Sequence, residues 1–294
     1  MSSAPLSNLL LIDGAMRSDA IRDVYRCHEI LAIRPLYLNT RFAELHAAGP
    51  VLISLAESSP LISETYHRNA HRPDASLLYS TESVDDVTIH LQRFIAPEDR
   101  SSGDKVMLRF ADPLTTIHWL SSYEGAQRDA VLGPIDAWHV PEHFHTWAPV
   151  SPSVWQTFLR EAPDPEWDDT LVCLGDEQFS ALDHATRWGL RERLNMSLEQ
   201  NYPRLIASID KRHRTQWLDD RLDEAREWGL ISARGIAIWA EYSLRWGEGF
   251  TQDRDGPYHQ WLAHMPDVLK LPPELRIQKM DNDCLIVNPK RDML

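Results

Sequence analysis

The sequence predicts an α/β lobe with a mixed sheet flanked by helices, followed by an all-helical lobe. From residue 9 to about residue 138, short apolar runs alternate with helical patterns, which is typical of a sheet covered by helices. After residue 175 the apolar side chains recur at helical spacing instead. The change of period between these two parts indicates two lobes with different architectures.

A proline-rich segment separates the two patterns. Five prolines fall within residues 141–169 and disfavour long regular elements there. The segment also contains several aromatic residues, so we expect it to pack onto a lobe and not to act as a free linker. The predicted division is an α/β lobe over residues 1–150, a packed connector over 151–175 and a helical lobe over 176–294.

The predicted strands are the short apolar runs of the first lobe, at residues 9–12, 36–38, 51–55, 76–80 and 105–110. A helix is predicted over residues 84–94, where apolar side chains share one helical face and Ser83 with Asp86 provides a capping pair. The last strand is expected to lead directly into another helix, because Asp112 suits its N-cap and Pro113 its first position.

The helical lobe opens with an apolar stripe at helical spacing over residues 179–198. A charged amphipathic helix then stops at Gly229, and Ser232 suits the N-cap of the next helix. In the tail that starts at Pro272, the apolar residues 285–287 predict a small strand or an extended docking segment.

Composition narrows the class of protein. The 294 residues are 43% hydrophobic, and a net charge of -14 disfavours nucleic-acid phosphate or an anionic membrane as the main partner. Cys27, Cys173 and Cys284 are too few and too widely spaced for a disulfide framework, and we expect buried thiols in a reducing compartment. Because the sequence carries no signal-peptide pattern and no apolar run of about 20 residues, a cytoplasmic location is expected.

One short motif suggests metal chemistry. His139, Glu142 and His143 have the His-x-x-Glu-His spacing of a zinc peptidase, which needs all three side chains on one helical face. Pro141 fits only the first turn of a helix, so a polar loop is expected instead. The sequence also lacks the common nucleophile-elbow, phosphate-loop and dinucleotide motifs. We expect no catalytic residues and no metal, and a metal-dependent hydrolase using this cluster is the alternative.

Several other motifs are interpreted as structural. Arg109 is expected to form an internal charge-assisted pair with Asp112 that fixes the corner between strand and helix. Dipeptides typical of backbone turns occur at three further places, which are Asp13-Gly14, Gly49-Pro50 and Gly133-Pro134.

The order of these motifs carries a family resemblance. The segments concerned are Leu10-Leu11-Ile12-Asp13-Gly14-Ala15, Ala48-Gly49-Pro50-Val51-Leu52, Arg109-Phe110-x-Asp112-Pro113 and Leu132-Gly133-Pro134-Ile135. Over about residues 8–140 the chain resembles the Tap/Tec-type effector adaptor-chaperones of bacterial type VI secretion, long catalogued as a domain of unknown function. The resemblance implies a non-enzymatic protein without a cofactor. Such a protein would bind a cognate secreted effector in the cytoplasm and load it onto a secretion spike of the VgrG/PAAR type.

The helical lobe holds many of the chain's 11 tryptophans. A small lobe has a limited interior, and Trp is over-represented at interface hot spots, so we expect some of these side chains to contact a partner. Trp217 lies off the apolar stripe of its helix and beside the one dense basic run of this acidic chain. The predicted partner-binding residues are Trp217, Trp239, Trp246, Lys211, Arg212 and Arg214.

Overall fold

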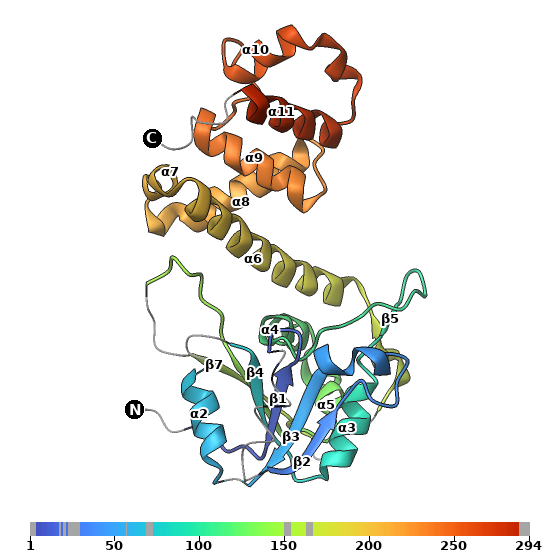
Figure 1. Ribbon diagram of the computed structural model, residues 1–294. Helices are drawn as coiled ribbons and strands as arrows, with labels where there is room; N and C mark the ends of the chain where they lie inside the picture. Colours follow the sequence, from blue (N-terminus) through green and yellow to red (C-terminus); the bar gives the residue numbers. More distant parts are fainter. Residues whose placement is uncertain are drawn as a thin grey trace. The chain divides into compact units, whose positions relative to one another are not determined.

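The computed structural model describes residues 4–17, 19, 22, 30–56, 58–68, 73–149, 154–162 and 167–287 (Figure 1). The chain forms two compact units. The first contains Met1–Phe144 and Val150–Ala185, and the second contains His145–Pro149 and Thr186–Leu294. The chain therefore passes between the units three times, the last time within one continuous helix, α6 (Asp176–Asn201).

The first unit is built on a six-stranded sheet with the order β2-β3-β1-β4-β6-β7, in which every pairing is antiparallel. A second sheet pairs β5 (Glu98–Asp99) with β8 (Cys173–Leu174) in parallel. The six strands are β1 (Leu9–Asp13), β2 (Ile30–Pro35), β3 (Pro50–Leu55), β4 (Ala75–Tyr79), β6 (Ala137–Pro141) and β7 (Trp155–Leu159).

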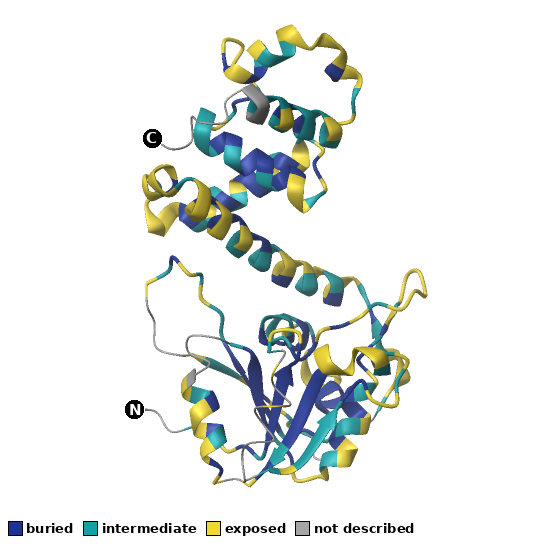
Figure 2. Ribbon diagram, viewed as in Figure 1, coloured by how far each residue is buried: buried dark blue, intermediate teal, exposed yellow. Residues whose placement is uncertain are grey.

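Helices cover both faces of this sheet (Figures 1 and 2). Alternation along β1 sends Leu9 and Leu11 into one core, and Leu10 and Ile12 into another. The first core contains side chains of α3 (Val84–Gln92), α4 (Pro113–Ser121) and α5 (Gly125–Leu132), whereas the second is covered by α2 (Pro60–Arg68). The central strands are consequently buried on both faces, which explains why β1, β3 and β4 are apolar at most positions; the polar exceptions are Asp13, Ser54 and Ser76.

The predicted strand at residues 36–38 is wrong. The strand β2 ends at Pro35, and the amide of Leu38 donates to the Pro35 carbonyl at 3.1 Å to close a turn. Leu36 and Tyr37 are nevertheless buried in the core. The apolar run therefore reports burial in a turn, and β2 lies just upstream of it.

The predicted strand at residues 105–110 is also wrong. Lys105 forms a single bridge with Glu98, and the amides of Val106 and Leu108 donate to the carbonyls of Pro97 and Ile95. The segment is thus paired with the chain that follows α3 and lies outside the sheet. Its alternation arises because Leu108 is buried while neighbouring Met107 is exposed.

The Pro-rich segment contributes one short strand, β7, to the large sheet. Residues 150–153 and 163–166 of this segment lie outside the described part of the chain. The predicted helix caps of the first unit are confirmed: Ser83 Oγ accepts a hydrogen bond from the Asp86 amide, and Asp112 Oδ1 accepts one from the Leu114 amide. Cys173 and Cys284 are half-buried free thiols, and Cys27 is outside the described residues.

His90 is a titratable group inside the first core. Its Nε2 lies 2.8 Å from the Val131 carbonyl, and its ring packs edge-on against Phe94 and Trp167. Gly133, at φ +54°, allows this contact, because a Cβ there would lie 2.3 Å from the imidazole. Desolvation by burial lowers the pKa of His90 to about 4.

We expect this histidine to destabilise the fold in acid. An unfolded chain protonates His near pH 6.5, whereas the folded chain resists protonation until about pH 4. The free energy of unfolding should therefore fall between pH 6.5 and pH 4. His90 alone should account for a loss of about 3 kcal/mol. Urea unfolding from pH 7 to 4 measures the loss, and His90→Gln, which cannot titrate, should show a shallower decline. Equal pH slopes for both proteins would contradict the prediction.

The second unit consists of helices (Figure 1). Beyond α6, they are α7 (Pro203–Ala207), α8 (Lys211–Glu227), α9 (Ala233–Trp246), α10 (Pro257–His264), the 3-10 turn η3 (Pro266–Lys270) and α11 (Pro273–Val287). The expected tail is wrong, because residues 285–287 continue α11 as helix. The predicted cap at Ser232 is confirmed by a 2.9 Å hydrogen bond from the Gly235 amide. The predicted fold class, a helix-flanked sheet followed by helices, is confirmed.

The core of the second unit contains the apolar stripe predicted for α6, including Leu190, Leu194 and Leu198. It also contains many of the aromatic side chains of this unit. Among the residues that the structure describes, no helix is both long and apolar enough to cross a membrane.

Candidate functional site

Asp13, at the end of β1, holds a turn and an arginine at the same time. Its Oδ1 accepts hydrogen bonds from the amides of Ala15 at 2.8 Å and Met16 at 3.3 Å. Its Oδ2 accepts a 2.6 Å hydrogen bond from Nη2 of Arg109. The predicted Arg109–Asp112 pair is present at 3.8 Å, so the closer and stronger partner of Arg109 is Asp13. We name Asp13, Arg109 and Asp112 the β1 corner.

Glycines bring the backbone close together beside this corner. A Cβ on Gly14 would lie 2.3 Å from the Gly49 carbonyl oxygen, and one on Gly49 would lie 2.5 Å from Cδ2 of Tyr37. Asp13 stands opposite Pro50 in the β1–β3 register, which places the two motifs side by side. The sequence motifs of residues 13–14, 49–50 and 109–113 therefore converge on one place in the fold.

Burial shapes the electrostatics of the β1 corner. It raises the pKa of the Asp112 carboxyl, although the Arg109 charge acts in the opposite direction. The pKa of the neighbouring Tyr37 is raised by burial and by the Asp13 charge. Each charged group of the corner has an oppositely charged group within 3.8 Å. This arrangement fixes residues 109–113 against the end of β1 through charge-assisted hydrogen bonds.

The last two motif residues, Gly133 and Pro134, make contacts away from the β1 corner. Gly133 faces the His90 ring, and the Pro134 carbonyl accepts a 2.6 Å hydrogen bond from Ser80 Oγ. Both residues lie in the connection from α5 to β6 and hold it against the last turn of α3 and the end of β4. They are structural residues, as the turn signal indicates, but they do not contribute to the β1 corner.

The zinc-peptidase spacing does not form a helix. His139 is buried within β6, where its Nδ1 lies 2.9 Å from Thr157 Oγ1, so the expected polar loop is wrong for this residue. Burial lowers the pKa of His139. Glu142 and His143 follow the end of the strand. Within the described residues, no three His, Cys, Asp or Glu side chains lie close enough to hold a metal ion together.

The basic run at the start of α8 divides into exposed and buried members. Lys211 and Arg212 are exposed, and Arg212 pairs with the helix-capping Asp210 at 2.8 Å. The side chain of Arg214 is only 3% exposed. It donates to Glu199 Oε1 at 2.7 Å and to the Ile206 carbonyl at 2.8 Å. The expectation of one continuous basic surface is therefore wrong at Arg214, because its charge is used inside the unit.

The predicted tryptophans divide in the same way. Trp239 is 4% exposed and packs against Trp228 and Phe250, so its role is in the core. Trp246 is half-buried against Tyr242 and Phe250. Trp217 is half-buried and lies 5.3 Å under the Arg221 guanidinium. Trp217 and Trp246 therefore retain some accessible surface, whereas Trp239 has almost none.

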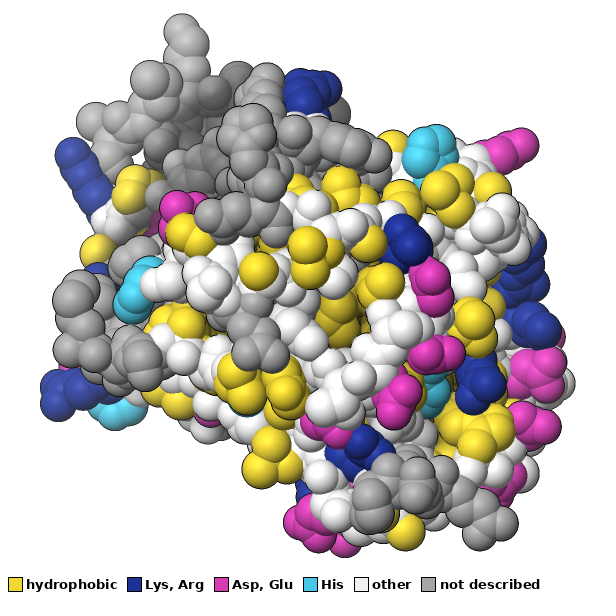
Figure 3. All heavy atoms as spheres, turned by 90° about the horizontal axis from the view of Figure 1, so that it is seen from below, with side chains coloured by type: hydrophobic (Ala, Val, Ile, Leu, Met, Phe, Trp, Pro, Cys, Tyr) yellow, Lys and Arg dark blue, Asp and Glu magenta, His cyan; other side chains and the backbone are white. Residues whose placement is uncertain are grey.

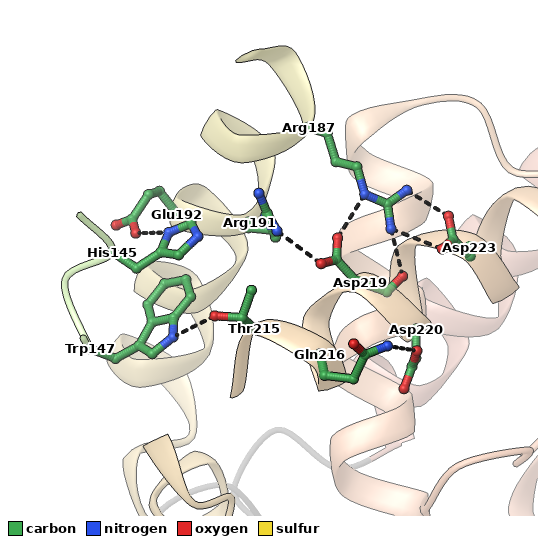
Figure 4. Close-up of polar contacts among 10 residues, drawn as sticks. All are labelled: His145, Trp147, Arg187, Arg191, Glu192, Thr215, Gln216, Asp219, Asp220 and Asp223. Atoms are coloured by element: carbon green, nitrogen blue, oxygen red, sulfur yellow. Dashed lines mark hydrogen bonds and ion pairs between the residues drawn. The ribbon is translucent and has the colours of Figure 1, made fainter. Parts of the chain in front are cut away.

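A segment that the site prediction omitted anchors the second unit (Figure 4). The His145 ring is sandwiched between Trp147, at 4.3 Å, and Trp188, at 4.6 Å. His145 Nδ1 lies 2.6 Å from Glu192 Oε1, and Trp147 Nε1 donates to Thr215 Oγ1 at 3.2 Å. Residues 145–149 thereby attach to both α6 and α8. Only the density of aromatic residues in the Pro-rich segment indicates this packing in the sequence.

A network of charges joins α6 and α8 beside this segment (Figure 4). Arg187 donates to the carboxylates of Asp219 at 2.7 Å and Asp223 at 2.6 Å, while Arg191 donates to Asp219 at 2.8 Å. The carboxylates raise the pKa of Arg187, with Asp223 the largest contributor. These charged side chains of α6 and α8 thus hold the two helices together.

The surface of the first unit carries side chains of mixed character (Figure 3). On the face drawn there, hydrophobic side chains are scattered between acidic and basic ones, and charges of both signs alternate along one edge. Exposed large hydrophobic residues of this unit include Leu31, Leu45, Ile89 and Leu159.

Comparison with known proteins gives one result. No curated protein and no solved structure matches the chain. Residues 9–130, which contain all three segments of the β1 corner, match the model of a family described as "Domain of unknown function (DUF4123)".

Proposed function

We propose that this protein is a non-enzymatic adaptor-chaperone. It binds a cognate type VI secretion effector in the bacterial cytoplasm and delivers it to a spike of the VgrG/PAAR type. The observation that carries this proposal is the match over residues 9–130, which covers three of the four motif segments of the resemblance to effector adaptors. The adaptor role itself comes from that resemblance.

The geometry of the matched region favours binding over catalysis. In many enzymes the motif residues leave a nucleophile, an acid or a base facing a cleft. Here Asp13, Arg109 and Asp112 face one another, and Gly14 with Gly49 permits close backbone packing. The motif residues maintain a scaffold, and a scaffold with a mixed surface suits recognition of another protein.

A metal-dependent hydrolase is not favoured. It would require His139, Glu142 and His143 on one helical face, whereas β6 contains His139 and ends at Pro141. The described residues provide no alternative group of three ligands. A general scaffold unrelated to secretion remains the competing function, and the identity of the bound partner distinguishes it from an adaptor.

Fewer residues of the second unit remain candidates for partner binding than the sequence predicts. Trp217, Trp246, Lys211 and Arg212 have exposed or half-exposed side chains and remain candidates. Trp239 and Arg214 are buried and act through packing and internal hydrogen bonds. Exposed charges such as Lys211 and Arg212 mainly increase the association rate with an acidic partner, whereas a buried aromatic contact lowers the dissociation rate.

Co-purification tests the proposal. The full chain is expressed with the secreted protein encoded beside its gene, and the complex is isolated through a tag on the effector. We expect a stable complex in which about 1,600 Å² or more of surface is buried, the size of a standard protein interface. A tagged effector from an unrelated locus is the control and should not retain the chain. If none of the neighbouring secreted proteins forms a complex with the chain, the adaptor function is refuted.

A further inference from the structure

Among the residues that the structure describes, the outer backbone groups of β7, the last strand of the large sheet, have no hydrogen-bond partner. The Glu142 amide donates to the Val154 carbonyl at 2.8 Å, and the Arg160 amide donates to the Asp136 carbonyl at 3.0 Å. In an antiparallel pair the backbone groups of alternate residues face the same way. Residues 154, 156, 158 and 160 therefore hydrogen-bond to β6. The N–H and C=O groups of Trp155, Thr157 and Leu159 point away from the sheet.

The opposite edge of the sheet is protected. The Leu36 amide donates to the Pro50 carbonyl at 2.8 Å, so the backbone of Pro35 points away from β3, and proline has no N–H to offer there. A register shift between Ile30 and Ala32 also places a bulge in β2. Proline and bulges are the common means by which proteins prevent an edge strand from pairing with another chain. The five residues of β7 contain neither device.

The side chains along β7 suit a strand-like ligand. Leu159 is 57% exposed and Val154 is 41% exposed, although both are apolar. Thr157 is exposed between them. The strand is held in place on both faces of the sheet, because the Trp155 ring stacks on Tyr66 of α2 at 5.1 Å and Phe158 is buried in the opposite core. The edge is thus both accessible and rigidly positioned, as a template for an added strand requires.

We propose that β7 is the docking site for an extended segment of the effector, which adds to the sheet as a seventh, antiparallel or parallel strand. Main-chain hydrogen bonds to Trp155, Thr157 and Leu159 would supply the affinity, and apolar side chains at alternate positions of the ligand would pack beside Leu159 on one face of the sheet. The inference rests on the proposed adaptor function and specifies where and how the effector is held.

The charge of the chain favours this occupant over a second copy of itself. Pairing two β7 edges would bring together two chains that each carry a net charge of -14. An uncharged or basic segment of another protein meets no such repulsion. The ligand is therefore expected to be an extended segment with alternating apolar residues and without an excess of acidic ones.

Hydrogen exchange of the complex with the neighbouring effector tests the site without any substitution. The amides of Trp155, Thr157 and Leu159 should exchange at least tenfold more slowly in the complex than in the free chain. Thr157→Pro removes the central outward N–H and leaves the main-chain hydrogen bonds to β6 intact, so it should weaken effector binding at least tenfold. It also removes the side-chain contact with His139, a loss that Thr157→Val shares. Thr157→Val keeps that N–H and should bind normally. Ile33→Pro removes the equivalent outward N–H from β2, at the opposite edge of the sheet. As the matched control, it should leave effector binding unchanged.

The outcomes separate the site from the function. A complex that forms with unchanged exchange at these three amides would overturn the β7 site while leaving the adaptor function intact. Equal affinity of Thr157→Pro and wild type would do the same. Light scattering measures the molar mass of the free chain. A dimer that Thr157→Pro abolishes would assign the β7 edge to self-association and overturn the effector site. Failure of the wild type to bind any effector would refute the function and the site together.

Discussion

Replacement of Trp147 by alanine is expected to lower the free energy of unfolding of the second unit by about 3–5 kcal/mol. The indole is 3% exposed and belongs to the core cluster that includes Leu190, Leu194 and Leu218. Its removal leaves a cavity of nearly the whole side chain between α6 and α8. It also removes the stacking partner of His145 and the hydrogen bond to Thr215.

Urea unfolding of the full chain, followed by hydrogen exchange of peptides from each unit, measures this effect. Peptides from α6 and α8 should lose protection in Trp147→Ala, because the indole packs directly against both helices. Thr215→Val, which removes only the hydrogen-bond acceptor of the indole, should cost about 1 kcal/mol. A loss below about 1 kcal/mol for Trp147→Ala would show that residues 145–149 are not an anchor of the second unit.

The sequence predicts the elements of this fold wherever one physical cause controls the pattern. Burial on both faces makes β1, β3 and β4 predominantly apolar, and local capping chemistry determines the helix starts at Ser83, Asp112 and Ser232. Each of these features is encoded within a few neighbouring residues. Their positions could therefore be predicted without knowledge of the tertiary structure.

The two strands predicted wrongly, at residues 36–38 and 105–110, have apolar patterns that depend on tertiary contacts. Leu36 and Leu108 are buried because distant parts of the chain cover them, and the backbone hydrogen bonds of both segments are made outside a strand ladder. Apolar spacing records that burial but not which backbone partner is present. The pairing of Arg109 with Asp13, 96 residues away, is likewise a tertiary contact. The nearer Asp112 is the partner that spacing along the chain can indicate.

The candidate binding residues could be predicted only in part. The sequence identifies the run of basic residues from Lys211 to Arg214 but gives no sign of which of them face inward. On a helix, Arg212 and Arg214 lie on different sides, and the side that carries Arg214 is buried against the carbonyls at the end of α7. The open edge of β7 is also invisible in the sequence, because strand order and hydrogen-bond phase both depend on the assembled sheet.

Arg214→Ala is expected to destabilise the second unit by about 2–4 kcal/mol, because it leaves two main-chain carbonyls without the donor that satisfies them inside the unit. The guanidinium of Arg214 joins three helices. It donates to Glu199 Oε1 of α6 at 2.7 Å, and to the carbonyls of Ile206 and Ile209 at 2.8 and 3.3 Å. An alanine leaves these acceptors without their donor and opens a cavity at the start of α8.

Urea unfolding of matched arginine variants tests this assignment. Arg212→Ala removes a side chain that is 82% exposed, so the unfolding transition should stay almost unchanged. If Arg214 instead formed part of a binding surface, its replacement would weaken effector binding and leave the unfolding transition unchanged. The structural role requires the reverse order: Arg214→Ala shifts the transition strongly, and Arg212→Ala alters only the association rate with the effector. The two arginines of one basic run thus serve different purposes because the helix turns one of them into the core.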